Sequence, residues 1–354
     1  MQGDFSKRHN MCEGYAINAV APQNPPISDA NVLRLAQAFG LARPCIFAYN
    51  HGYRNHSFGV LAGDARYNLL LLKNEPDVLK RIKNADKVAE IAHLAGMPVR
   101  TLASPKTLKI ASNGQTRFAR LYFWLDGDTI PWEAYTRKHL KALGKSLAEL
   151  HVALGGQTPP STPSLPDALQ ELVSHNTQMQ AYFAREGVKN ALKRKLHLKT
   201  RQNHAKIASF LASDTLQNLP RQPLHLDFVR GNILWDGSQA PCVRACDDPC
   251  SPRISGIIDF EKSALGSPLI DLARTYAFLL VDCPKAPGQI RKYFLCKGYS
   301  CVFPAKIFAQ LTNFFLIFDF YKFLAHNPYE SLENNYHFCR TRDILVSRKI
   351  LEDI

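Results

Sequence analysis

The stretch LHLDFVRGNILWDG (residues 224–237) decides the fold. It places His225, Asp227 and Asn232 within eight positions, with apolar residues on either side. Asp and Asn are common in turns because their side chains hydrogen-bond the local backbone, so a plain turn is one interpretation. The run NILW that follows predicts a short strand, which places the three polar residues on the loop before it.

A second stretch with a candidate acidic residue follows downstream, SGIIDFE (residues 255–261). Its apolar run predicts another short strand, and Asp259 comes where that strand ends. A loop Asp, a loop Asn and a strand-end Asp supply a carboxylate base and hard oxygen ligands. Phosphoryl transfer requires these groups, because a carboxylate orients the attacking hydroxyl while oxygen ligands hold Mg²⁺ on the phosphates. Together the two stretches favour a phosphoryl-transfer site over a plain turn.

The N-terminal half offers complementary groups. HGYRNHSFGV (residues 51–60) lies between two predicted strands, where backbone amides could cover phosphates. Lys73 ends the run LLLLK, and four leucines in a row predict a buried strand. We therefore expect the Lys73 ammonium to reach the phosphates, the alternative being a solvated lysine at a strand end.

The chain changes character along its length. Residues 1–26 are polar and predict a flexible arm. Residues 27–126 combine a helix beginning at Ser28 or Asp29, several strands and a helix over 75–96, with Asn113-Gly114 as a hairpin turn. From residue 127 the pattern is mostly helical and includes one long amphipathic helix over 132–154.

These motifs carry a family resemblance. HLDFVRGNILW (225–235) resembles the H-x-D-x-x-x-x-N catalytic loop of the aminoglycoside phosphotransferase and choline kinase superfamily. GIIDFEKSALGSPLIDLA (256–273) is similar to its metal-binding Asp segment and the following D-P-x-x-D-L-A stretch. G-x-x-N-x-x-F-x-V at 52–60 resembles its nucleotide loop, and LDGDTIP (125–131) its hinge. The resemblance covers most of residues 30–290, in the family's order.

The resemblance implies an α+β, bilobal protein-kinase-like fold. A small antiparallel-sheet N-lobe would span residues 27–126 and bind the nucleotide, and a larger, mainly helical C-lobe would span 127–354. The implied activity is an ATP- and Mg²⁺-dependent phosphotransferase acting on a hydroxyl of a small molecule such as an amino alcohol, a homoserine-like compound, a sugar or an aminoglycoside. The alternative is a catalytically silent kinase-like fold that binds a partner or RNA through its basic surface.

The resemblance also assigns roles residue by residue. Asp227 would be the catalytic base, with Asn232 and Asp259 as the Mg²⁺ ligands. The groups implied for the nucleotide are Gly52, Asn55 and Lys73, and those implied to support the catalytic segment are His225 and Asp271. The substrate pocket would form from the helices after 127 and after 268, including Trp132, Arg274, Asp319 and Tyr321.

The sequence departs from the family pattern at two positions. The helix Glu that usually pairs with the strand Lys is replaced by Ala85, so we expect Asp86, or Glu90 one turn on, to pair with Lys73 instead. Ser267 stands before Pro268 where the family commonly has Asp. Because Asp271 is kept, we expect the segment to retain its role.

Composition limits the other function classes. A formal net charge of +14 favours an anionic partner and makes a polycationic substrate a poor match. The basic run KNALKRKLHLKTRQNHAK (189–206) lacks interleaved aromatics, so it indicates a solvated helix face more than a nucleic-acid site. The N-terminus shows no signal pattern and no apolar run is long enough for a membrane span, so we expect a soluble cytoplasmic enzyme.

The cysteines form one local cluster. Cys242, Cys246 and Cys250 are spaced four apart, with Asp247 and Asp248 between the last two. A metal site is one interpretation, but structural zinc usually takes four ligands. We favour an inserted loop between the two catalytic strands and expect reduced thiols throughout the chain.

Overall fold

The computed structural model describes residues 27–51, 55–112, 114–159, 218–237, 251–326 and 336–347, together with short pieces at 181, 184–188, 190 and 213. The chain forms two compact units, one of Met1–His93 and Val99–Asp126, the other of Leu94–Pro98 and Gly127–Ile354. Several predictions lie outside the described residues: the N-terminal arm over 1–26, the solvated helix over 189–206 apart from Asn190, and the insert that contains Cys242, Cys246 and Cys250.

The first unit is built on a five-stranded antiparallel sheet in the order β1-β2-β3-β5-β4. Its strands are β1 (Cys45–His51), β2 (His56–Ala62), β3 (Ala65–Lys73), β4 (Leu108–Ser112) and β5 (Gln115–Phe123). The β2–β3 turn has Gly63 at φ 61° and the β4–β5 turn has Gly114 at φ 72°. Both glycines adopt the left-handed conformation that a tight hairpin requires.

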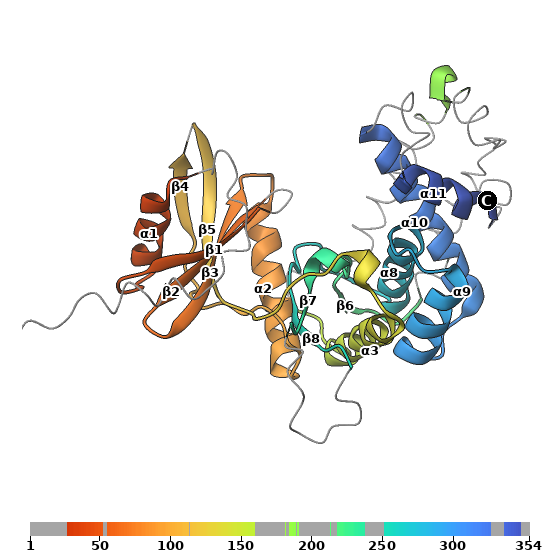
Figure 1. Ribbon diagram of the computed structural model, residues 1–354, viewed down its shortest axis with the longest axis horizontal. Helices are drawn as coiled ribbons and strands as arrows, with labels where there is room; N and C mark the ends of the chain where they lie inside the picture. Colours follow the sequence, from red (N-terminus) through yellow and green to blue (C-terminus); the bar gives the residue numbers. More distant parts are fainter. Residues whose placement is uncertain are drawn as a thin grey trace, which may run out of the picture. The chain divides into compact units, whose positions relative to one another are not determined.

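Both faces of this sheet are covered by helices, as Figure 1 shows. Leu69 and Leu71 of β3 pack in the cluster that contains α1 (Asp29–Ala38), whereas Leu70 and Leu72 pack against α2 (Val78–Leu94). Successive side chains of a strand point to opposite faces, so four consecutive leucines can all be buried. This explains the LLLL run, with each buried leucine contributing roughly 2 kcal/mol.

The second unit contains two short strand pairs that frame the polar stretches. β6 (Gln222–Leu224) pairs with β9 (Ala264–Gly266), and β7 (Ile233–Trp235) pairs with β8 (Ile254–Ile257), both antiparallel. The short 3₁₀ helix η3 (Arg230–Asn232) leads directly into β7. Residues 225–232 are therefore a loop held at both ends by paired strands.

The remaining elements of this unit are helical. They are η2 (Trp132–Ala134), α3 (Arg137–Ala153), α8 (Pro268–Asp282), α9 (Pro287–Ile290), the π-helix η4 (Arg291–Tyr299), α10 (Ala305–His326) and α11 (Tyr336–Ser347). The helix predicted over 132–154 is interrupted, because Thr136 is extended and its side chain caps α3 by accepting the His139 N–H. The cap begins a new helix at Arg137.

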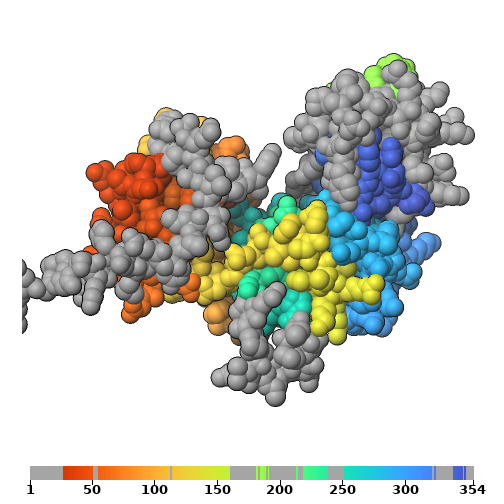
Figure 2. Space-filling view, viewed as in Figure 1, coloured from red at the N-terminus to blue at the C-terminus, as the bar shows by residue number. Residues whose placement is uncertain are grey.

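Glycines bring α3 and η4 unusually close together. A Cβ at Gly144 would collide with the carbonyl oxygen of Phe294, and a Cβ at Gly298 would lie 2.7 Å from the Lys141 carbonyl oxygen. The two elements lie side by side although they are far apart in the sequence, and Figure 2 shows their yellow and blue surfaces in contact. This approach brings Tyr299, the last residue of η4, to His151 of α3.

The segment predicted as a hinge pairs with β7. Asp128 and Trp235 exchange two backbone hydrogen bonds, at 3.0 and 2.9 Å. Gly127 has φ 115°, and a Cβ there would lie 2.6 Å from the Trp235 carbonyl oxygen, so only glycine fits. Within the described residues no helix has the length and apolar content needed to cross a membrane.

Candidate active site

The loop after β6 is organised around the buried side chain of His225. Its Nδ1 accepts the Asp227 backbone N–H at 3.2 Å, so Nε2 carries the proton and donates to the Ile258 carbonyl at 3.1 Å. The ring packs against Phe228 and Phe260. His225 thus ties the loop that carries Asp227 to the segment that carries Asp259.

The carboxylate of Asp271 accepts two backbone hydrogen bonds from the same loop. Its Oδ2 accepts the backbone N–H of His225 at 2.9 Å and its Oδ1 accepts that of Leu226 at 3.0 Å. Leu226 has φ 59°, a left-handed conformation that costs a non-glycine residue roughly 1–2 kcal/mol. The two hydrogen bonds to a charged acceptor offset that cost and fix the direction in which Asp227 leaves the loop.

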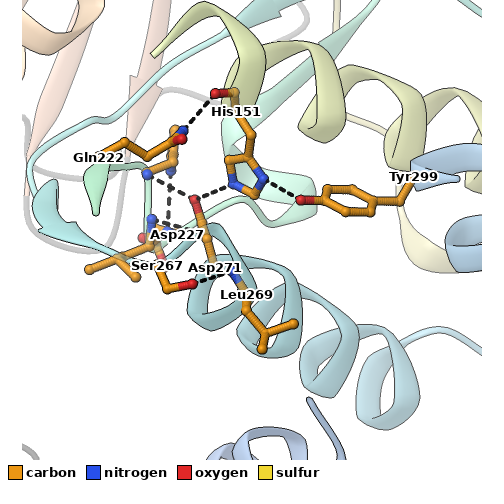
Figure 3. Close-up of polar contacts among 9 residues, drawn as sticks. His151, Gln222, Asp227, Ser267, Leu269, Asp271 and Tyr299 are labelled. Atoms are coloured by element: carbon orange, nitrogen blue, oxygen red, sulfur yellow. Dashed lines mark hydrogen bonds and ion pairs between the residues drawn. The ribbon is translucent and has the colours of Figure 1, made fainter. Parts of the chain in front are cut away.

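Asp271 is itself held by a buried chain of side chains, drawn in Figure 3. His151 of α3 contacts Oδ2 through Nε2 at 3.3 Å, and its Nδ1 lies 2.8 Å from the Tyr299 hydroxyl. Gln222 donates to the His151 carbonyl at 2.6 Å. Burial alone would raise the pKa of Asp271, but the bond and charge of His151 together with the His225 contacts hold it below its ordinary value.

The start of α8 places Asp271 in this position. Ser267 is the N-cap residue, and its hydroxyl accepts the Leu269 N–H at 3.3 Å, while Pro268 occupies the first helical position. Serine is as good an N-cap residue as aspartate, so the departure from the family pattern at Ser267 preserves the cap. Asp271 then lies in the first turn, where a negative charge also suits the helix dipole.

Asp227 and Asn232 are joined across the loop. The Asn232 amide nitrogen donates to the Asp227 carbonyl at 2.9 Å and to its carboxylate at 3.2 Å. This use of the amide nitrogen leaves the Asn232 side-chain oxygen as the group available to a cation. The ammonium of Lys262 lies 2.8 Å from the other Asp227 carboxylate oxygen.

The electrostatics keep Asp227 ionised. Burial would raise its pKa, but the charge and hydrogen bond of Lys262, followed by the charge of Arg274, hold the pKa below its ordinary value. An ionised carboxylate is the form that can accept a proton at neutral pH.

Asp259 follows β8 and also has a left-handed backbone, with φ 66°. The Ile258 N–H donates to the Asn232 carbonyl at 3.0 Å, so the strand pairing brings the two predicted metal ligands onto adjacent segments. A carboxylate and an amide oxygen fit Mg²⁺, which takes one or two protein carboxylates and completes its shell with phosphates and water. The described residues contain no group of three or more His, Cys, Asp and Glu side chains suited to a metal. They therefore do not form a site in which protein side chains supply all the metal ligands.

In the first unit, Asn55 and Lys73 lie together at adjacent strand ends. The Asn55 side-chain oxygen accepts the Lys73 backbone N–H at 3.1 Å, which fixes the exit of the loop before β2 to the end of β3. The Lys73 side chain is exposed and its ammonium lies 3.8 Å from Glu75. Gly52 lies outside the described residues.

The expected pair between Lys73 and α2 is wrong. Asp86 is bonded to Arg120 of β5 and accepts a hydrogen bond from the Tyr122 hydroxyl at 3.0 Å. Arg120 and Tyr122 face α2, whereas Lys73 continues the odd-numbered series of β3 that faces α1. Glu90 does not pair with Lys73 either, because the only ion pair of Lys73 among the described residues is with Glu75.

The Asp86 pair is a structural one. Arg120 is buried and also donates to the Pro105 and Lys106 carbonyls and to the Thr107 hydroxyl. Burial raises the pKa of Asp86 more than Arg120 and Tyr122 lower it. Both terminal nitrogens of the Arg120 guanidinium bond protein groups. Arg120 therefore has no pair of donors left to bind a phosphate.

Comparisons with known proteins agree with this geometry. The Phosphotransferase enzyme family matches the sequence over residues 48–299, which is more than half of the chain. The chain belongs to this family. No curated protein matches the sequence significantly.

Solved structures of phosphotransferases share the fold. An amicoumacin kinase in complex with AMP-PNP and Ca²⁺ aligns with a TM-score of 0.63 at 12% identity, covering 93% of this chain and 96% of the other. A microcompartment-associated aminopropanol kinase gives 0.57 at 14% identity, with coverages of 92% and 99%. A spectinomycin phosphotransferase in complex with ADP and spectinomycin gives a TM-score of 0.54 at 15% identity, covering 92% of this chain and 100% of the other. The α+β, protein-kinase-like fold and the phosphotransferase class predicted from the sequence are thus confirmed.

Three residues of this phosphotransferase were not singled out by sequence reasoning. Lys262 contacts Asp227, and His151 and Tyr299 extend the Asp271 chain. Lys262 carries a signal in the sequence, as a lone cation three residues after Asp259, the predicted metal ligand. His151 and Tyr299 carry none, since each lies far along the sequence from Asp271.

The predicted pocket residues have different surroundings. Trp132 is buried and packs against Tyr135, with ring centroids 4.5 Å apart, so it belongs to the core of the second unit. Arg274 lies on α8, partly exposed, three residues after Asp271. Asp319 is on α10, and the side chain of Tyr321 lies outside the described residues.

Proposed function

We propose that this chain is an ATP- and Mg²⁺-dependent kinase that transfers the γ-phosphoryl group to a hydroxyl of a small molecule. The observation that carries the proposal is the arrangement of Asp227, Asn232 and Asp259 on adjacent segments, with Asp227 held ionised beside Lys262. A base and two oxygen ligands on a rigid loop are the groups that in-line phosphoryl transfer uses.

The reaction assigns a distinct task to each group. Asp227 accepts the proton of the acceptor hydroxyl while the hydroxyl oxygen forms a bond to the γ-phosphorus. The bond from that phosphorus to the β–γ bridging oxygen breaks, and ADP leaves with the electron pair. Asn232 and Asp259 would hold Mg²⁺, which neutralises charge on the phosphates. Lys73 stays a prediction as a phosphate contact, and Asn55 as the residue that shapes the loop before it.

The comparisons support the nucleotide. Two of the similar structures hold AMP-PNP or ADP, and one holds a divalent cation. The names of these proteins differ in the acceptor, which is amicoumacin, aminopropanol or spectinomycin, so what they share is phosphoryl transfer to a small molecule. The formal net charge of +14 argues against a polycation as the acceptor of this chain.

Nucleotide binding is the first test. Thermal unfolding is followed with ATP alone, Mg²⁺ alone and both, on the wild type and on Asp259→Ala. A ligand at about 100 times its Kd stabilises the folded state by about 2.7 kcal/mol, which gives a clear rise in Tm. We expect Mg·ATP to raise the Tm of the wild type and to have little effect on Asp259→Ala.

Asp343→Ala is the matched control, because Asp343 is an exposed aspartate of the same unit, on α11, whose ion pair among the described residues is with Arg342. It should respond to Mg·ATP like the wild type. If Mg·ATP at millimolar concentration leaves the wild-type Tm unchanged, the kinase proposal is wrong. A catalytically silent, partner-binding fold then becomes the better description.

A further inference from the structure

Arg274 is a partly exposed cation whose donors are not used by any of the residues that the structure describes. Its guanidinium lies over the rings of Phe278 and Phe315, 5.2 and 5.3 Å from their centroids. Its Nε is buried without a hydrogen-bond partner, and Arg274 forms no hydrogen bond or ion pair among the described residues. A guanidinium normally uses its N–H donors on carboxylates, phosphates or carbonyls.

Arg274 lies on the helix that holds the loop of the proposed catalytic base. Its charge contributes to the lowered pKa of Asp227, after that of Lys262. Arg274 lies one turn after Asp271 on α8, and Asp271 holds the loop that carries Asp227. The cation is therefore positioned on the rigid element that supports the reacting group.

The two cations near Asp227 have different tasks. Lys262 is bonded to the Asp227 carboxylate at 2.8 Å and so is committed to it. The Arg274 guanidinium lies over two aromatic rings, and cation–π contacts of this kind do not use its hydrogen-bond donors. A guanidinium with free donors is suited to bind a planar carboxylate or a phosphate in a bidentate manner.

One acidic side chain, that of Asp319, is relevant to the opposite possibility, an acceptor that binds through a positive charge. Asp319 follows Phe315 by one turn on α10, the helix that packs on α8. It has contacts of its own and forms no ion pair with Arg274. An acceptor that bound through an ammonium group alone would point to Asp319 rather than to Arg274.

We propose that the acceptor of this kinase is an alcohol that also carries an oxyacid group, a carboxylate or a phosphate monoester, and that Arg274 binds this group. The inference rests on the proposed function, since it names the substrate class of the same site. The formal net charge of +14 is consistent with it, because a basic protein attracts an anionic acceptor. Arg274 is a specificity-determining residue in this description, and Asp227 remains the base.

Matched pairs of compounds test the substrate class. Each acid is compared with a twin that lacks only the charge: glycerate with glyceramide, 4-hydroxybutyrate with its amide, homoserine with homoserine amide, and glycerol 3-phosphate with glycerol. ADP release with Mg·ATP gives kcat/KM for each compound, and thermal shift with Mg·AMP-PNP gives binding. We expect the acid of at least one pair to exceed its twin by about tenfold or more. A preference in any of the first three pairs indicates a carboxylate, and a preference in the last pair indicates a phosphate monoester.

Variants then assign the preference to Arg274. Arg274→Gln should raise the KM for the preferred acid by about 10- to 100-fold and leave the twin nearly unchanged. Arg274→Lys keeps the charge but loses the planar pair of donors. Its KM for the preferred acid should therefore lie between those of the wild type and Arg274→Gln. Arg342→Gln is the control, because Arg342 is an arginine of α11 whose one ion pair among the described residues is with Asp343. It should behave like the wild type.

The outcomes separate this inference from the function on which it rests. If no acid is preferred over its twin in either measurement, or if Arg274→Gln weakens acid and twin equally, the inference is wrong. A preference for amines that lack an acid also overturns it and points to Asp319. If Mg·AMP-PNP binds while any of these results is found, only the inference fails. If no nucleotide binds, the proposed function fails first.

Discussion

Asp271 holds Leu226 in a left-handed backbone conformation. The Leu226 N–H donates to Oδ1 of Asp271 at 3.0 Å while its φ is 59°. The strain lies one residue before Asp227, the proposed base, and a buried carboxylate maintains it. The His151 and Tyr299 side chains in turn orient that carboxylate, so the geometry of Asp227 depends on residues far from it along the chain.

Asp271→Asn should destabilise the protein by about 3 kcal/mol. Each carboxylate oxygen of Asp271 accepts from a backbone N–H, so either orientation of the amide places an NH₂ group against a donor. Chemical denaturation measures the loss. Asp343→Asn, on the exposed Arg342 pair, should change stability by no more than about 0.5 kcal/mol. Equal stabilities of the two variants would contradict the role given to Asp271.

At position 226, glycine should be more stable than alanine. Both substitutions remove the same apolar side chain beyond Cβ, but only glycine adopts φ 59° without cost, a difference of about 1 kcal/mol. Denaturation midpoints of Leu226→Gly and Leu226→Ala test this order. Val152, exposed on α3, is the control, and there alanine should be the more stable by a similar amount. Alanine above glycine at both positions would show that Leu226 is not strained.

Lys262→Met should move the acidic limb of the pH–rate profile to higher pH. Lys262 lowers the pKa of Asp227, so the base stays ionised to lower pH with the lysine than without it. The kcat/KM profile of ADP release between about pH 4 and pH 8 measures the shift. Lys145→Met, which removes the exposed Lys145–Glu149 pair, should leave the limb in place. An unshifted limb in Lys262→Met would mean that Asp227 is not the titrating base.

A double-mutant cycle should show coupling between Asp86 and Arg120 and none between Asp86 and Lys73. Arg120 and Asp86 form a buried pair, so Arg120→Met alone leaves a buried carboxylate and should cost about 3–5 kcal/mol. The coupling energy should fall in the range of about 0.5–3 kcal/mol. Lys73→Met should change stability by less than about 0.5 kcal/mol, since its pair with Glu75 is exposed. Coupling to Lys73 would restore the pairing expected from the sequence.

Local signals in the sequence anticipated much of the fold. The start of the first helix at Ser28 or Asp29, the hairpin turn at Gly114 and the strand over the four leucines were predicted from residue type and spacing, and the structure has them. The cap at Thr136 was missed, because a continuous amphipathic pattern hides a break in the backbone. The pairing of Lys73 was also missed, because it depends on which face of the sheet each strand position takes.

The sequence by itself determined the family and the α+β class, and it named the candidate site residues, because each is carried by residue types at short, fixed spacings. Only the tertiary structure decided which groups meet. Lys262 reaches Asp227, Arg120 pairs with Asp86, and Arg274 has no hydrogen-bond partner in the described part of the chain. The physical reason is that side-chain pairing and burial depend on strand parity and on contacts between segments distant in sequence, and neither is written in a local pattern.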